Sequence, residues 1–121
     1  MPRFLQKALL ASIPICVLLA TVPVAKAADQ RYIWCWAAPV NPDIRKTFYT
    51  RVFVGDFSEM IPIKAAFAKY VRDTYPDDNT GPAVCNFVMT RDEASSALSK
   101  AKANTKWNEL EVVNTDWTYS E

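Results

Sequence analysis

The chain has 121 residues, of which 50% are hydrophobic, and its 14 basic and 13 acidic residues give a formal net charge of +1. It contains no histidine and only two glycines. These counts exclude histidine-based nucleophilic triads, a glycine-rich phosphate loop and the positive surplus that nucleic-acid binding needs. The sequence predicts no metal site and no cofactor. Histidine, the usual zinc ligand, is missing, and the two cysteines that lie after residue 27 do not close a zinc site.

Residues 1–27 have the pattern of a cleaved signal peptide. Two basic residues precede an apolar stretch from 8 to 24, and the Ala-Lys-Ala of 25–27 fits the A-x-A cleavage pattern. A membrane anchor is the alternative, but prolines interrupt the stretch, and it is shorter than the roughly 20 residues that span a bilayer. Cleavage would leave residues 28–121 as one small domain without a membrane span, in a periplasmic or secreted location.

Two cysteines remain after this cleavage, Cys35 and Cys85. An even number of cysteines in a small exported domain indicates a disulfide, and two free thiols are the alternative. The bridge would close a loop of about 50 residues and stabilise the fold by about 3–4 kcal/mol.

The first predicted strand covers residues 32–38. Its period of two places Tyr32, Trp34 and Trp36 on one face and Cys35 on the other. A disulfide at Cys35 would therefore leave the two tryptophans on the opposite face of the strand.

Residues 47–57 predict a second strand, which follows a turn that contains two prolines. Its alternation places Tyr49, Arg51 and Phe53 on one face and Phe48 on the other. The strand is expected to run without interruption to the glycine near its end.

Two helices are predicted downstream. The first runs from a cap at Ser58 to the residue before Pro76, with its apolar side chains on one stripe. The second begins at a capping box formed by Thr90 and Glu93 and buries a thin stripe of alanine and leucine. A helix with such small apolar residues must pack close to its partner.

Further strands at 83–89 and 110–119 complete the order β-β-α-β-α-β. This order predicts an α+β two-layer sandwich of about four mainly antiparallel strands, with both helices on one face. A Cys35–Cys85 bridge would make the first and third strands neighbours, since bridged Cα atoms lie roughly 4.4–6.8 Å apart.

The aromatic face of the first strand would then lie on the uncovered side of the sheet. An exposed aromatic patch indicates a ligand or a partner. The residues predicted to form this binding face are Tyr32, Trp34, Trp36, Tyr49 and Arg51. The alternative is that the tryptophans pack inside the core, as aromatic cross-strand pairs do.

Three short motifs between residues 47 and 119 resemble one known family. RVFVGDFS (51–58) is similar to the opening strand of the SPOR domain, the sporulation-related repeat, with Gly55 and Phe57 at matching places. MTRDEASSAL (89–98) is similar to the start of that family's second helix, and LEVVNT to its closing strand. The resemblance implies peptidoglycan binding in a bacterial envelope. In general build the chain also looks like other small exported bacterial proteins.

Together these features predict a non-catalytic envelope protein that binds a cell-wall glycan or another envelope protein. A periplasmic inhibitor or immunity-type protein is the alternative. A third candidate is a carboxylate-dependent hydrolase, because acidic pairs such as Asp92 and Glu93 are present. Acids in the first turn of a helix also favour the helix dipole, so surface placement is the expected explanation for this pair.

Overall fold

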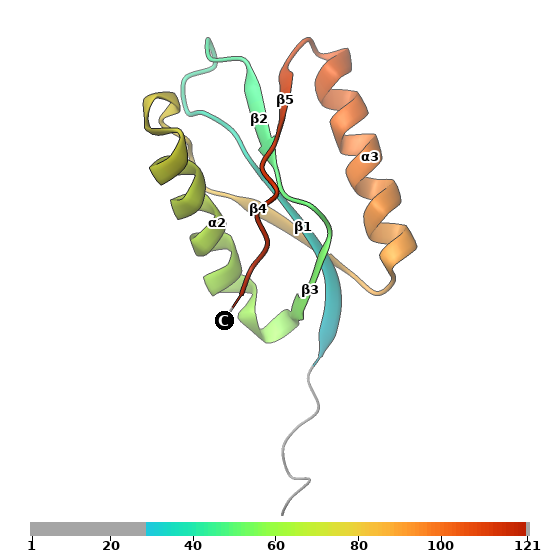
Figure 1. Cartoon of the computed structure of the whole chain (residues 1–121). Helices are drawn as coiled ribbons and strands as arrows, with labels where there is room; N and C mark the ends of the chain where they lie inside the picture. The colour runs from blue at the N-terminus through green and yellow to red at the C-terminus, as the bar shows by residue number, and fades with distance from the viewer. Residues whose placement is uncertain (1–28, 121) are drawn as a thin grey trace, which may run out of the picture.

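The computed structural model describes residues 29–120, and the predicted signal peptide lies outside them. In this part of the chain, five strands and two α-helices form an α+β fold with a mixed sheet (Figure 1). The elements are β1 (Gln30–Ala37), β2 (Lys46–Tyr49), β3 (Phe53–Asp56), η2 (Phe57–Glu59), α2 (Met60–Thr74), η3 (Pro76–Asp78), β4 (Val84–Val88), α3 (Arg91–Trp107) and β5 (Glu111–Asn114).

β1 is the central strand of the sheet. β4 lies antiparallel along one side of it, and β2 and β3 lie antiparallel along the other side. β5 pairs with β2 in parallel at the far edge. The prediction of a mainly antiparallel sheet is confirmed, and β5 is the parallel exception.

A bulge separates β2 from β3, which otherwise continue one another along β1. Trp36 lies opposite Tyr49 and Ile33 lies opposite Phe53. The two residues of β1 between these pairs therefore face three residues, 50–52, between β2 and β3. The alternation changes phase at this point, and Tyr49 and Phe53 pack on opposite sides of the sheet. The prediction of one uninterrupted strand with both residues on the same face is therefore wrong.

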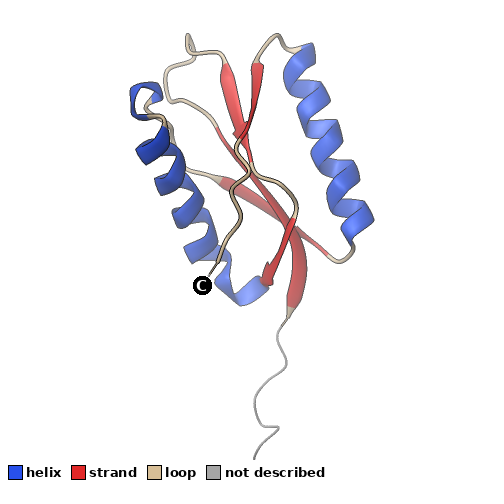
Figure 2. Cartoon of the chain, viewed as in Figure 1, coloured by secondary structure: helices blue, strands red, loops and turns tan. Residues whose placement is uncertain are grey.

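The two helices cover opposite faces of the sheet, so the molecule has three layers (Figure 2). α2 packs on the face of β1 that carries Ile33 and Cys35. α3 packs on the face that carries Trp34. The predicted α+β class is confirmed, but the two helices lie on opposite faces of the sheet rather than on one.

The path of the chain across the sheet explains this arrangement. β3, β4 and β5 all run parallel to one another, because each is antiparallel to β1 or parallel to β2. α2 carries the chain from β3 past β1 to β4, and α3 carries it back from β4 to β5. Crossovers between parallel strands are almost always right-handed. Two such crossovers in opposite directions place their helices on opposite faces.

α2 covers the larger part of the core. Ile63, Phe67 and Val71 are fully buried on the predicted stripe of this helix. Trp117, in the segment after β5, closes the same core with its ring centroid 5.1 Å from that of Phe67 and 5.8 Å from that of Phe53. This layer therefore combines aliphatic and aromatic side chains from three separate segments.

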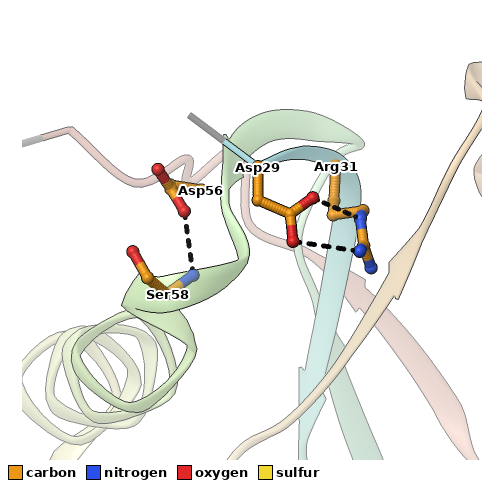
Figure 3. Close-up of polar contacts among 4 residues, drawn as sticks. All are labelled: Asp29, Arg31, Asp56 and Ser58. Atoms are coloured by element: carbon orange, nitrogen blue, oxygen red, sulfur yellow. Dashed lines mark hydrogen bonds and ion pairs between the residues drawn. The ribbon is translucent and has the colours of Figure 1, made fainter. Parts of the chain in front are cut away.

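The helix starts differ in how well the sequence predicted them. The carboxylate of Asp56 accepts a hydrogen bond from the Ser58 N–H at 2.9 Å (Figure 3), so Asp56 caps η2, and α2 begins at Met60. The prediction that Ser58 caps the helix is therefore wrong, because Ser58 lies within the short 3-10 turn that precedes α2. The predicted N-cap of α3 is confirmed, since the Thr90 hydroxyl accepts from the Glu93 N–H at 3.1 Å. The Glu93 carboxylate accepts from the Thr90 hydroxyl, also at 3.1 Å, rather than from the Thr90 N–H that a capping box uses.

The predicted disulfide joins Cys35 of β1 to Cys85 of β4. The two residues lie directly opposite each other in the strand register, with Cα atoms 4.0 Å apart. On its other side, Cys35 bonds the bulge: its N–H donates to the Thr50 hydroxyl at 2.9 Å, and its C=O accepts from the Thr50 N–H at 3.0 Å. The bridge thus fixes β4 to the centre of the sheet.

Candidate functional site

α3 covers the aromatic face that the sequence analysis assigned to a ligand. Trp34 retains 5% of its exposure and Tyr49 retains 3%, and both pack against Ala94 and Leu98 of this helix. The three aromatic residues of β1 do share a face opposite to Cys35, as predicted. That face is closed rather than open, because the second crossover lies over it.

The five predicted site residues do not form one surface. Two are buried as described, and Tyr32 lies at the N-terminal end of α3, with the Arg91 guanidinium 5.1 Å from its ring centroid. Trp36, at the opposite end of β1, is half-buried, and Arg51 is exposed within the bulge. The predicted exposed patch is therefore wrong as a unit, although single members of it line cavities.

A cavity of about 400 Å³ lies between the C-terminal half of α3 and the sheet, and we call it the Trp36 cavity. It brings together two of the predicted site residues, Trp36 and Tyr49. Its lining residues are Trp36, Ala38, Thr47, Tyr49, Ala101, Asn104, Thr105, Asn108 and Leu110.

Small side chains and one fixed tyrosine keep this space open. The Tyr49 hydroxyl lies 2.5 Å from the Thr105 hydroxyl and donates to the Ala101 C=O at 3.2 Å. The tyrosine ring therefore stands between β2 and α3 and sets their separation. The side chain of Ala101 is a single methyl group and is too short to fill the space beside this ring. That unfilled space is the cavity.

The end of α3 forms the outer wall of the Trp36 cavity. The Glu109 N–H donates to the Lys106 C=O at 2.9 Å and the Leu110 N–H to the Thr105 C=O at 3.0 Å, which is a Schellman motif. Glu109 takes the left-handed conformation of this motif, with φ 60°. The motif turns Leu110 back beneath the helix, into the cavity wall.

The lining of the Trp36 cavity carries no charged side chain. The Asn108 amide is oriented by donation from its Nδ2 to the Asn104 C=O at 2.9 Å, and the Asn108 C=O accepts from the Arg45 guanidinium at 2.8 Å. The side-chain oxygen of Asn108 and the amide of Asn104 make no hydrogen bond within the described chain. The cavity therefore presents amide donors and acceptors beside an indole.

Three residues of the cavity were not predicted as site residues from the sequence: Thr47, Asn104 and Asn108. Trp107 was likewise not distinguished from the other tryptophans. Trp107 is the last residue of α3 and keeps 84% of its exposure, directly before Asn108 in the chain. One signal was available: Trp107 lies off the apolar stripe of the predicted helix, where a tryptophan has no core to enter. The asparagines gave no such signal, because exposed amides are common on helices.

A second cavity, of about 420 Å³, lies between α3 and the bulge. Arg51 and Lys102 line it together with Asp116, so its lining carries both signs of charge. Burial lowers the pKa of Lys102, and the nearby charge of Lys106 lowers it further. The mixed charge of this cavity contrasts with the neutral lining of the Trp36 cavity.

Within residues 29–120, no three His, Cys, Asp or Glu side chains gather closely enough to hold a metal ion. Neither described α-helix combines the length and the apolar composition that a membrane crossing requires.

Comparisons of the chain with protein families, with curated proteins and with solved structures gave no match. The function is therefore inferred from the chemistry of the site alone.

Proposed function

We propose that this protein is a non-catalytic binding module of the bacterial envelope that holds a neutral glycan in the Trp36 cavity. The observation that carries this proposal is the lining of the cavity, which combines an indole with amides and hydroxyls and contains no charge. Its volume of about 400 Å³ lies within the range of roughly 300–1,000 Å³ found for small-ligand sites.

The polar lining matches the hydrogen-bonding character of a sugar. Each sugar hydroxyl both donates and accepts, and a primary amide such as that of Asn104 supplies both functions. The ring of Trp36 offers an apolar surface on which the C–H face of a sugar ring packs. A charged ligand would find no counter-charge in this lining.

Trp107 extends the site beyond the cavity. An indole that keeps 84% of its exposure leaves a large apolar surface in water, and such surfaces indicate binding. A glycan chain longer than the cavity would continue onto this ring. Peptidoglycan, the ligand implied by the SPOR resemblance, is a polymer of this kind.

The disulfide supports the proposed location in the periplasm or outside the cell. Disulfides persist in oxidising compartments and are rare in the cytosol. The Cys35–Cys85 bridge agrees with the export signal predicted for residues 1–27.

Two variants test the cavity. Asn104→Ala removes an exposed amide and Trp107→Ala an exposed ring, so both proteins are expected to fold. Each change should weaken binding to insoluble peptidoglycan, and to soluble chito-oligosaccharides, by about tenfold, which corresponds to about 1.4 kcal/mol. Ser95→Ala, an exposed position in the first half of α3, is the matched control. A double variant that cosediments and titrates like the wild type would contradict the proposal.

Fluorescence gives an independent readout of the same contact. Acrylamide should quench Trp107 far more than Trp34, which retains 5% exposure. Saturation with chito-oligosaccharide is expected to protect Trp107 from the quencher, and the Trp107→Phe variant should lose this protection. Unchanged quenching in the presence of bound sugar would place the glycan elsewhere.

A further inference from the structure

β4 is an edge strand of the sheet in the described part of the chain. Its inner side pairs with β1 over five residues, from Val84 to Val88. Among residues 29–120, no strand pairs with its outer side. This outer side of Val84–Val88 is called the β4 edge below.

The β4 edge lacks the features that normally protect an exposed strand. Natural edge strands carry charges, prolines or bulges that prevent pairing with another chain. β4 reads VCNFV and contains none of them, whereas β5, at the other edge, is one residue shorter and carries Glu111. Val84 and Met89 add exposed apolar surface along β4, with 41% and 64% of their exposure retained.

The register shows which backbone groups the β4 edge presents. Cys35 directs its N–H and C=O towards Thr50, away from β4. Cys35 and Cys85 are therefore a non-hydrogen-bonded pair, as their short Cα separation of 4.0 Å also indicates. The N–H and C=O of Cys85, and by alternation those of Phe87, consequently point outward from the sheet.

A groove of about 400 Å³ lies between α2 and the chain that leads into β4. Its lining residues are Ile61, Lys64, Ala65, Ala68 and Arg72 of α2, with Pro82 and Ala83 from the chain leading into β4. The stretch of α2 from Ile61 to Arg72 is about 17 Å long, and five residues of strand span about the same length. The groove and the β4 edge thus offer matching lengths to one extended segment.

Two aromatic rings meet near the C-terminal end of β4, outside the lining of the groove. Phe57 packs edge-on against Phe87 of β4, with ring centroids 5.5 Å apart. The Arg31 guanidinium lies 4.7 Å from the centroid of the Phe57 ring and is held by two hydrogen bonds to the Asp29 carboxylate, at 3.1 and 3.2 Å (Figure 3). Since the Arg31 charge is already paired, it does not set the charge of the groove.

The charge of the groove comes from Lys64 and Arg72. Neither forms an ion pair with another described residue, and the lining contains no acid. Ala65 and Ala68, between them along the helix, leave space for apolar side chains. The lining therefore complements a segment that alternates apolar and acidic side chains.

We infer that the β4 edge and this groove dock an extended acidic segment of a partner protein as an added strand. The backbone of the segment pairs with Cys85 and Phe87, and every second side chain enters the groove. Its carboxylates meet Lys64 and Arg72. A second copy of this chain fits less well, because two β4 edges paired about a twofold axis would bring four cations together without an acid.

A displayed library of random nine-residue peptides tests this inference with the oxidised protein. Peptides that alternate apolar residues with Asp or Glu should be enriched. The Lys64→Glu/Arg72→Glu variant should bind a selected peptide at least tenfold more weakly. Lys100→Glu/Lys106→Glu, which makes the same change in net charge on the exposed side of α3, should bind it like the wild type.

Hydrogen exchange locates the bound peptide. Its addition should slow exchange of the Cys85 and Phe87 amides and leave glycan binding at the Trp36 cavity unchanged. Enrichment without acidic residues, or equal binding by both charge variants, would overturn the inference. So would an unaltered exchange rate at Cys85 and Phe87, or a wild-type protein that forms a dimer through the β4 edge and takes up no peptide.

Discussion

The two helical layers cover the same sheet in different ways. α2 contributes Ile63, Phe67 and Val71, all fully buried, to one hydrophobic core. α3 covers the other face mainly with small side chains, and its largest buried apolar residue is Leu98. The first layer is built for packing, and the second leaves two cavities beside the helix. We therefore expect stability to be concentrated on the α2 side, and the proposed glycan site lies on the α3 side.

Polar contacts reinforce this contrast. The α3 layer is positioned by the hydroxyl of Tyr49 and its contacts with Thr105 and the Ala101 C=O. It also contains the buried indole nitrogen of Trp34, which has no hydrogen-bond partner in the described chain. Burying such a group costs free energy that a packed aliphatic side chain does not. The α3 layer is therefore expected to open more readily than the α2 layer.

The largest expected loss of stability comes from truncating one buried side chain in each layer. Phe67→Ala should lower the free energy of unfolding by about 3–5 kcal/mol, and Leu98→Ala by about 2–3 kcal/mol, because Leu98 is smaller and keeps 8% of its exposure. Urea unfolding of both variants measures the difference. Equal losses would remove the contrast between the layers.

The disulfide is the next largest contribution. Replacing both cysteines by alanine opens a loop of 50 residues and should cost about 3–4 kcal/mol. The loss should appear on the α2 side, because the fully buried Cys35 belongs to that core. Hydrogen exchange of the variant is expected to accelerate first in β4 and α2, and acceleration confined to α3 would contradict this assignment.

Removing one hydroxyl should loosen the α3 layer alone. Tyr49→Phe deletes the contacts with Thr105 and Ala101 at almost constant volume and should cost about 1 kcal/mol. Exchange of the α3 amides should rise several-fold while that of the α2 amides stays near the wild-type rate. Uniform acceleration in both helices would show that the two layers open as one unit.

The smallest expected effect concerns a contact outside both cores. Lys46 Nζ lies 3.0 Å from the Asp78 carboxylate, and this hydrogen bond raises the pKa of Lys46 above its ordinary value of 10.5. A raised pKa in the folded state means that the stabilisation is complete below pH 10.5 and is lost as the pH rises through the folded-state value.

Lys46→Met should therefore lack part of the alkaline loss of stability. Urea midpoints at about pH 9 and about pH 11 measure that loss, and a smaller difference is expected for the variant than for the wild type. Lys100→Met, which replaces an exposed lysine that forms no ion pair with another described residue, is the control. An identical pH difference in Lys46→Met and the wild type would contradict a role for this pair.

Local patterns in the sequence determined much of the secondary structure. The alternation of β1, the stripe of α2 and the N-cap at Thr90 depend on neighbours within a few residues, and all three are confirmed. The pairing of Cys35 with Cys85 also followed from the sequence, since these are the two cysteines that the predicted cleavage after residue 27 would leave. Trp107 was within reach of the same reasoning, because it lies off the apolar stripe of α3.

Only the tertiary structure decided the phase of β3, the face that each helix covers and the presence of the Trp36 cavity. A one-residue bulge at Arg51 and Val52, opposite Trp34, moves every later side chain of the strand to the other face, and no local pattern marks it. The side on which a helix lies depends on the direction in which its crossover traverses the sheet, and that direction depends on strands far apart in the sequence. The alternation of Trp34 and Trp36 therefore placed them on a common face, while the connection from β4 to β5 determined that α3 covers it.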